Sequence, residues 1–288
     1  MKAGKASSTA KGVAWARAIA TQGHGRVRID DRFAADVLPW YSRVALRASA
    51  SESFVSHAIG TLLDGASAGM VEHLAMRTAA IDAAVTQAVD SGADQLVVLG
   101  AGLDTRVHRL ALAHCDAFEV DHPDTQRIKQ SRALTLPLAA RSLRYVAVDF
   151  AHDSLANRLR AGGFDPARRS VWIWEGVTMY LPMSAVHATL QTLKELAAEG
   201  STLAMTYFLA EGSPQTKRYA AFGRAILRAL GEPILSTMTS DTVRSELFAA
   251  GFELVSDASE NEWCEELGIA PARIDAFHGE HLAVARRL

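Results

Sequence analysis

Residues 95–100 read QLVVLG and continue through AGLDT to Thr105, and this stretch decides the fold class. An apolar run of this length that ends in glycine is typical of a buried parallel strand followed by a tight turn. Upstream, apolar residues recur at helical spacing from Met70 onward, and Gly92 is placed to end that helix. The stretch therefore predicts a helix, a buried strand and then a turn.

Strands and helices alternate after this turn. Further strands are expected over residues 117–120, 144–148, 171–174 and 201–208, with helices near Pro123, over 154–160 and over 184–198. This alternation predicts an α/β fold with a doubly wound, mostly parallel sheet. The segments 252–255 and 281–285 predict an antiparallel pair that completes the sheet at its C-terminal end.

One domain is the economical interpretation of the chain. No internal repeat or linker rich in Pro, Gly or Ser divides residues 1–288. The expected parts are an N-terminal helical cap (11–65), a cofactor-binding core (70–208), a helical lid insertion (209–250) and C-terminal strands (251–288).

Composition narrows the classes of partner. Hydrophobic residues make up 49% of the 288 residues, and 30 basic against 32 acidic side chains leave a formal net charge of -2. Nucleic-acid and membrane binders usually need a concentrated basic face, so neither partner is expected. The N-terminal segment lacks an apolar stretch of signal-peptide length, and Cys115 and Cys264 lack metal-ligand spacing. We expect a cytoplasmic protein with reduced thiols and no metal.

The residues at the predicted strand ends carry the chemistry. Gly100 and Gly102 close the first strand, Asp121 the second, Asp149 the third and Glu175 the fourth. In an open α/β sheet, ligands bind beyond the carboxyl ends of the strands. Glycines let backbone approach a ligand without a Cβ in the way. The series therefore predicts a ligand site at this edge.

Two nucleotide-type ligands fit that geometry. Asp121 lies 19 residues beyond Gly102, a spacing that suits a carboxylate holding a ribose diol. The dinucleotide pattern requires a third glycine where this chain has Thr105, and Asp104 places negative charge near the expected pyrophosphate. S-adenosylmethionine carries no phosphate, so the residues favour this methyl donor over NAD.

The motifs together resemble the leucine carboxyl methyltransferase family, including bacterial members that act on small metabolites. The matching segments are Arg77-Thr78, Ile81-Asp82, LGAGLDTR (99–106), FEVDHP (118–123), Val148-Asp149-Phe150, WEGVTMYLP (174–182), Gly231-Glu232-Pro233 and Gly251-Phe252. The similarity covers roughly residues 70–285, and a weaker similarity extends to the N-terminal segment. It implies a Rossmann-like class I methyltransferase fold with S-adenosyl-L-methionine as cofactor.

The resemblance also implies roles for the donor side of the site. Arg77 would pair with the methionine carboxylate of the cofactor, a task that suits guanidinium geometry. Gly100 and Gly102 would pass beside the methionine and ribose moieties, and Asp121 would hold the ribose hydroxyls.

The remaining implied roles concern the adenine, the sulfonium end and the acceptor. Asp149 and the backbone of Phe150 would meet the adenine, although the family usually has a leucine-like residue at position 150. Glu175 would lie near the methionine ammonium or sulfonium. Tyr180, in the loop after the fourth strand, is the candidate catalytic residue that orients the acceptor; as a buried aromatic, it could equally support the loop.

The sequence thus predicts an O-methyltransferase that acts on a carboxylate or acidic hydroxyl of a small molecule. The core motifs offer no unmistakable general base, and this slightly favours an acceptor that is ionised or readily ionised. The cap and the lid insertion are expected to fold over the strand ends and to recognise the methyl acceptor. Two alternatives stay open: an NAD-dependent oxidoreductase and a non-catalytic protein that binds S-adenosylmethionine.

Overall fold

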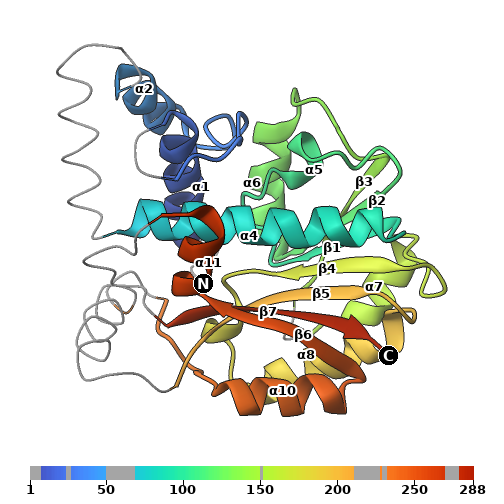
Figure 1. Ribbon diagram of the computed structural model, residues 1–288. Helices are drawn as coiled ribbons and strands as arrows, with labels where there is room; N and C mark the ends of the chain where they lie inside the picture. The colour runs from blue at the N-terminus through green and yellow to red at the C-terminus, as the bar shows by residue number, and fades with distance from the viewer. Residues whose placement is uncertain are drawn as a thin grey trace.

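A computed structural model describes residues 8–23, 27–49, 69–149, 152–210, 228, 232–269 and 279–288 of the chain. Its centre is a seven-stranded sheet in the order β3-β2-β1-β4-β5-β7-β6 (Figure 1). The strands are β1 (Gln95–Leu99), β2 (Asp116–Asp121), β3 (Ser142–Ala147), β4 (Ser170–Trp174), β5 (Thr202–Phe208), β6 (Phe252–Ser259) and β7 (Glu280–Arg287).

The sheet is parallel from β3 to β5, and β7 pairs antiparallel with both β5 and β6. All seven predicted strands are present, with ends that differ from the predicted ones by at most four residues. The expected antiparallel C-terminal pair is confirmed as well. Tertiary pairing extends β6 past residue 255, because the neighbouring β7 offers partners up to Ser259.

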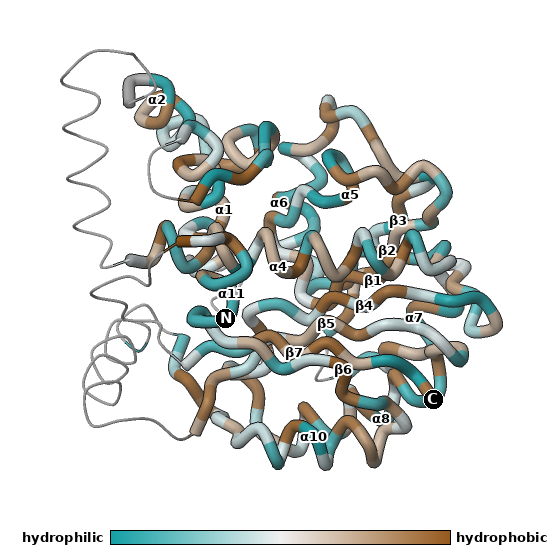
Figure 2. The backbone as a smooth tube through the Cα atoms, in the orientation of Figure 1, coloured by the Kyte–Doolittle hydropathy of each residue, from teal (hydrophilic) through white to brown (hydrophobic). Residues whose placement is uncertain are grey.

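The central strands are buried on both faces. All five residues of β1 are buried, with Leu96 and Val98 in one hydrophobic cluster and Val97 and Leu99 in the other. Successive side chains of a strand point to opposite faces, so a continuous apolar run fits a strand covered on both sides. Figure 2 shows this apolar band along the central strands.

Helices form a layer on each face of the sheet (Figure 1). One layer holds α4 (Met70–Asp90), α5 (Arg106–Arg109), α6 (Pro123–Ala133) and the added helices α1 (Ser8–Thr21), α2 (Trp40–Ser49) and α11 (Glu260–Leu267). The other holds α7 (Leu155–Ala161), α8 (Met183–Leu196) and α10 (Ser240–Ala249). A short 3-10 turn, η1 (Thr178–Tyr180), follows β4.

Local sequence explains where the core helices begin and end. Pro123 is the first residue of α6, and the His122 side chain accepts a hydrogen bond from the Asp124 amide. Ser154 caps α7 by accepting from the Asn157 amide. Gly92, with φ of 99°, follows α4 in the left-handed conformation that glycine tolerates. Because β1 to β5 pair in parallel, their carboxyl ends lie at the same edge of the sheet, where these turns begin or end the helices.

Candidate active site at the carboxyl edge of the sheet

The turn after β1 is built on two glycines in the left-handed region. Gly100 has φ of 68° and Gly102 has φ of 49°. A Cβ on Gly100 would lie 2.5 Å from Val177 Cγ2, and one on Gly102 would lie 3.3 Å from Ala10 Cβ in α1. The loop after β4 and the N-terminal helix therefore press against this turn, so close packing of the chain itself requires glycine at position 100.

Asp121 at the end of β2 is joined to this turn. Its Oδ2 accepts a hydrogen bond from the Gly102 amide, and its Oδ1 accepts one from the His122 amide, each at 2.6 Å. Burial raises the pKa of Asp121, although both backbone hydrogen bonds oppose that shift. The two amides hold the carboxylate in a fixed orientation, and each oxygen keeps a lone pair for a further donor.

Asp149 lies two residues beyond the end of β3, and β3 is the strand that pairs with β2. Its amide donates to Asp153 Oδ2, and its own Oδ2 lies 2.9 Å from His152 Nδ1. The Asp149 side chain is 40% exposed, which leaves it open to a ligand at the sheet edge. Phe150 lies outside the described residues, so its expected adenine contact stays a prediction.

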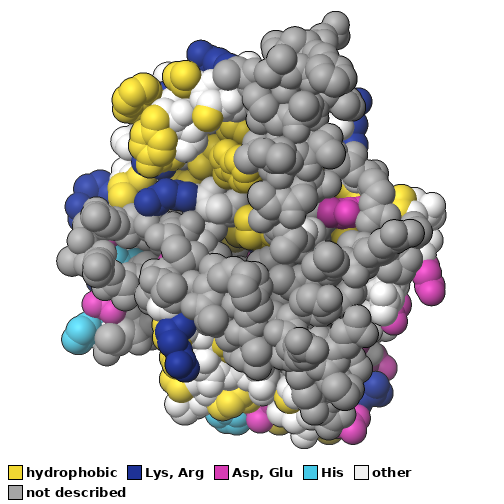
Figure 3. Space-filling model, turned by 90° about the vertical axis from the view of Figure 1, so that its left-hand side faces the viewer, with side chains coloured by type: hydrophobic (Ala, Val, Ile, Leu, Met, Phe, Trp, Pro, Cys, Tyr) yellow, Lys and Arg dark blue, Asp and Glu magenta, His cyan; other side chains and the backbone are white. Residues whose placement is uncertain are grey.

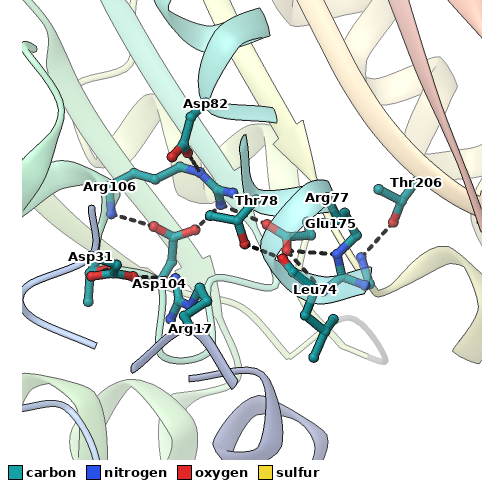
Figure 4. Close-up of polar contacts among 12 residues, drawn as sticks. Arg17, Asp31, Leu74, Arg77, Thr78, Asp82, Asp104, Arg106, Glu175 and Thr206 are labelled. Atoms are coloured by element: carbon teal, nitrogen blue, oxygen red, sulfur yellow. Dashed lines mark hydrogen bonds and ion pairs between the residues drawn. The ribbon is translucent and has the colours of Figure 1, made fainter. Parts of the chain in front are cut away.

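Glu175 just after β4 and Arg77 in α4 form a partly buried ion pair (Figure 4). Arg77 Nε and Nη2 lie 3.0 and 2.9 Å from Glu175 Oε1, while Arg77 Nη1 donates to both oxygens of Glu280 at 2.9 Å. Burial alone would raise the pKa of Glu175, but attraction to Arg106 and Arg77 lowers it. The structure thus brings Arg77 and Glu175 together and gives Arg77 a second carboxylate partner.

Tyr180 lies on η1, close to the same ion pairs. Its hydroxyl is hydrogen-bonded to Thr9 of α1, and Thr9 also donates to the Glu232 carboxylate. Burial raises the pKa of Tyr180 to about 12; the neighbouring Glu232 also raises it, whereas the Thr9 hydrogen bond opposes the shift. Tyr180 is therefore a neutral phenol that joins α1, the loop after β4 and the segment preceding α10.

Sequence reasoning missed a second set of charged residues in this site. Arg106 at the start of α5 contacts Asp82 at 2.7 Å, Glu175 at 2.7 Å, and also Asp104. Arg17 of α1 donates to the Leu103 carbonyl at 2.6 Å. Asp31 completes the set through Arg17, Arg109 and Thr105. For Asp82, Asp104 and Arg106 the signal was their place in the quoted motifs.

The position of Asp104 corrects one step of the sequence argument. Its carboxylate is buried against Arg106, and its pKa is lowered: burial opposes ionisation, but attraction to Arg106 and Arg17 prevails. Because Arg106 compensates this charge, Asp104 adds little repulsion toward a pyrophosphate. The missing third glycine, where Thr105 instead donates to buried Asp31, remains the stronger argument against a dinucleotide.

The donor set of the site fits S-adenosylmethionine. Three carboxylates (Asp121, Asp149 and Glu175) lie at or just beyond the carboxyl ends of β2, β3 and β4, and the glycine turn follows β1, the strand between β2 and β4. A carboxylate held by backbone amides suits a ribose diol. The carboxylate of Glu175 can offset the positive charge of an ammonium or a sulfonium.

Comparison with known proteins places the chain in a family. A model of the leucine carboxyl methyltransferase family matches residues 10–194. The chain is 39% identical over 206 residues to a protein of Mycolicibacterium paratuberculosis, covering 68% of this chain and 64% of that protein. It is 33% identical over 237 residues to a protein of Frankia alni, covering 78% of each. Both relatives are named "Putative S-adenosyl-L-methionine-dependent methyltransferase".

The chain belongs to the leucine carboxyl methyltransferase family. The matched part spans 64% of the length of the first relative. A solved structure of a DUF574 family protein from Streptomyces avermitilis matches with a TM-score of 0.62 over 99% of both chains, at 18% identity, a likeness of fold. The predicted family and the Rossmann-like class I methyltransferase fold are both confirmed.

The sheet order separates this fold from the dinucleotide-binding one. In the dinucleotide-binding order the sixth strand follows the fifth directly, whereas here the antiparallel β7 lies between β5 and β6. The oxidoreductase alternative therefore loses the support of both the fold and the glycine pattern.

Within the described ranges, no helix has the length and apolar character needed to cross a bilayer.

Proposed function

We propose that this chain is an S-adenosylmethionine-dependent O-methyltransferase that acts on a small molecule. The observation that carries the proposal is the set of carboxylates at the ends of β2, β3 and β4, arranged around the glycine turn of β1. Family membership and the names of the relatives support the cofactor.

The donor side follows from charge and hydrogen-bond capacity. Asp121 would accept from the ribose hydroxyls, and Asp149 would accept from the adenine amine. Glu175, held by Arg77 and Arg106, would face the ammonium or sulfonium. Arg77 already has two carboxylate partners, so its contact with the cofactor carboxylate would add to the Glu175 and Glu280 pairs.

The bound cofactor would supply an electrophilic methyl group on its sulfonium. The chain contributes position: a fixed Asp121, a buried Glu175 and the packed turn at Gly100 hold one end of the site rigid. Holding reactants in line can lower a barrier by about 7–11 kcal/mol in favourable cases. Helix α1, packed over Gly102 and Leu103, would keep water from this side.

The acceptor side is proposed to lie at Tyr180. Its phenol is hydrogen-bonded to Thr9, which donates its own proton to Glu232, so an acceptor oxygen would take the place of Thr9 as the partner of the phenol O–H. Both a carboxylate and an acidic hydroxyl are acceptors consistent with O-methylation. Of the two, Glu232 favours the hydroxyl, because a carboxylate repels an anionic acceptor and can take the proton of a neutral one.

The proposed lid has support in the described segment that precedes α10. Leu235 donates its amide to the Met179 carbonyl at 2.7 Å, and Ser236 donates its hydroxyl to the Thr178 carbonyl at 2.9 Å. The segment before α10 therefore lies against η1 at the carboxyl edge. Residues 24–26 and 50–65 of the cap, and 211–227 and 229–231 of the lid, lie outside the described residues, so their role stays a proposal.

Calorimetry with S-adenosylhomocysteine on the wild type and on Asp121→Ala tests the donor side. We expect binding by the wild type and at least about tenfold weaker binding by the variant, since hydrogen bonds to a charged group are lost. Equal affinities would reject the ribose assignment. Stabilisation by NADH but not by S-adenosylhomocysteine would instead support the oxidoreductase.

The transfer itself is tested with a labelled methyl donor and paired libraries of carboxylic acids and phenols. Label in an ester or an aryl ether identifies the acceptor class. A chain that binds S-adenosylhomocysteine but transfers label to neither library, nor to an extract of small metabolites, would favour the non-catalytic alternative.

A further inference from the structure

His73 is buried in α4 between two carboxylates. Its Nδ1 lies 3.2 Å from Glu260 Oε2, and its Nε2 lies 2.8 Å from Glu280 Oε2. The imidazole and both carboxylates are almost fully buried, with side-chain exposures of 0%, 4% and 1%. The three residues come from α4, α11 and β7, so the fold brings together groups about 200 positions apart in sequence.

The protonation state of His73 follows from its partners. An ionised carboxylate only accepts hydrogen bonds, and a neutral imidazole has one N–H and one lone pair. A neutral ring here would therefore turn a lone pair toward one carboxylate, whereas an imidazolium donates to both. Burial opposes ionisation of Glu280, but the charge and hydrogen bonds of Arg77 lower its pKa, which keeps it a carboxylate.

Glu280 links His73 to the proposed cofactor site. The same carboxylate that faces His73 accepts two hydrogen bonds from Arg77 Nη1, and Arg77 in turn holds Glu175. The charged groups that face His73 are Glu260 from α11 and Glu280 from β7, with Arg77 one turn along α4. Without a second cation, Arg77 alone would have to compensate Glu280 as well as share Glu175.

We propose that His73 is held as an imidazolium and acts as a positioning residue for the cofactor site. It fixes the Glu280 carboxylate, and through Glu280 it sets the orientation in which Arg77 presents Glu175. The positioning part of this inference rests on the proposed function of Arg77 and Glu175; the protonation state does not.

Nitrogen NMR of the histidine rings in the full-length chain tests the protonation state. The His73 signals are assigned by comparison with His73→Gln, and His187, whose Nδ1 lies 2.9 Å from Glu246 at the surface, is the reference. We expect both His73 ring nitrogens to be protonated at pH 7.5. A neutral His73 tautomer at that pH would overturn the proposal.

Calorimetry with S-adenosylhomocysteine tests the positioning role. We expect His73→Gln to bind about tenfold or more weakly, and His187→Gln to stay within about twofold of the wild type. His73→Gln and Glu280→Gln should be non-additive, because both break one chain of contacts. Wild-type affinity in a folded His73→Gln protein would overturn the positioning role.

Two further results separate this inference from the proposed function. If the wild type itself fails to bind S-adenosylhomocysteine, the proposed function and the positioning role both fall, while the NMR spectrum still decides the protonation state. If His73→Gln does not fold, Glu260→Gln replaces it: that variant keeps the Glu280 contact, so it should bind within about twofold of the wild type. A larger loss would show that the ring does not act through Glu280.

Discussion

The backbone amide of Gly102 donates a 2.6 Å hydrogen bond to Oδ2 of Asp121. This bond joins the turn after β1 to the end of β2, and the His122 amide fixes the other oxygen of the same carboxylate. The ribose-binding geometry proposed for Asp121 is therefore formed by the protein alone. A preformed carboxylate loses less ordering entropy on binding than a mobile one.

Asp121→Asn should weaken S-adenosylhomocysteine binding about tenfold, because an amide can accept through only one of its two terminal atoms. Calorimetry measures the loss. Asp116→Asn is the matched control, since Asp116 begins the same strand and contacts Arg141 and Arg168 away from the site. Equal losses in the two variants would argue for a general effect on β2.

Gly100→Ala should destabilise the fold through both backbone and packing. Its φ of 68° costs about 1–3 kcal/mol for a residue with a Cβ, and the 2.5 Å approach to Val177 adds about 1–3 kcal/mol. Urea unfolding measures the sum. Gly163→Ala is the control, because Gly163 has φ of 91° but no atom within 4 Å of its added Cβ.

The packing part of the Gly100 prediction can be isolated. Adding Val177→Ala to Gly100→Ala removes the atom in conflict, so the two changes should cost less together than the sum of their separate costs. Strict additivity would mean that backbone strain alone accounts for the glycine.

The strand ends could be predicted from sequence because each one is a local pattern: an apolar run followed by glycine or a carboxylate. The ion pairs could not. Arg77 and Glu280 lie 203 residues apart, and the Arg17 side chain donates to the backbone carbonyl of Leu103, 86 residues away. Taken alone, each of these charged residues resembles a solvated helix or strand residue. Only the packing of α1 and β7 against α4 shows that they are buried and paired.

Helices with a local start signal could likewise be predicted from the sequence, whereas a helix that depends on tertiary contacts could not. Pro123 and Ser154 mark their helix starts in the sequence. Helix α11 between β6 and β7 was not predicted, although Ser259 and Glu262 form a capping box there. Its eight residues are too few for a clear apolar period, and its burial of Trp263 is a tertiary effect.

Glu280 should make stability depend on acid. Its pKa is about 2 in the folded chain against an ordinary 4.5, so its contribution is complete above pH 4.5 and is lost as pH falls toward 2. Glu280→Gln should be less stable than the wild type by about 3–5 kcal/mol at neutral pH, since Arg77 and His73 each lose one of their two buried carboxylate partners. Chemical unfolding at pH 7, 5, 4 and 3 measures the difference.

The difference in unfolding free energy between the wild type and Glu280→Gln should narrow below pH 4.5. For one proton it narrows by at most about 1.4 kcal/mol per pH unit. Stability curves that stay parallel down to pH 3 would show that Glu280 is not the group that titrates. Because His73 as well as Arg77 lowers the pKa of Glu280, the narrowing also depends on the charge of the imidazole.

Glu232→Gln tests which acceptor the site takes. If the acceptor is a hydroxyl, Glu232 receives its proton, and the amide variant should lose about a hundredfold or more in kcat on phenols. S-adenosylhomocysteine affinity should stay within about twofold of the wild type, because Glu232 lies beside Tyr180 and Thr9 and not at the strand ends. Glu246→Gln at the surface is the control.

Carboxylate acceptors should respond in the opposite direction. They need no base, and the amide removes a like charge beside Tyr180, so Glu232→Gln should leave kcat on them unchanged and lower KM. Tyr180→Phe should slow both acceptor classes, since the phenol donates to either oxygen. Unchanged rates on both classes in Glu232→Gln and Tyr180→Phe would place the methyl acceptor away from η1.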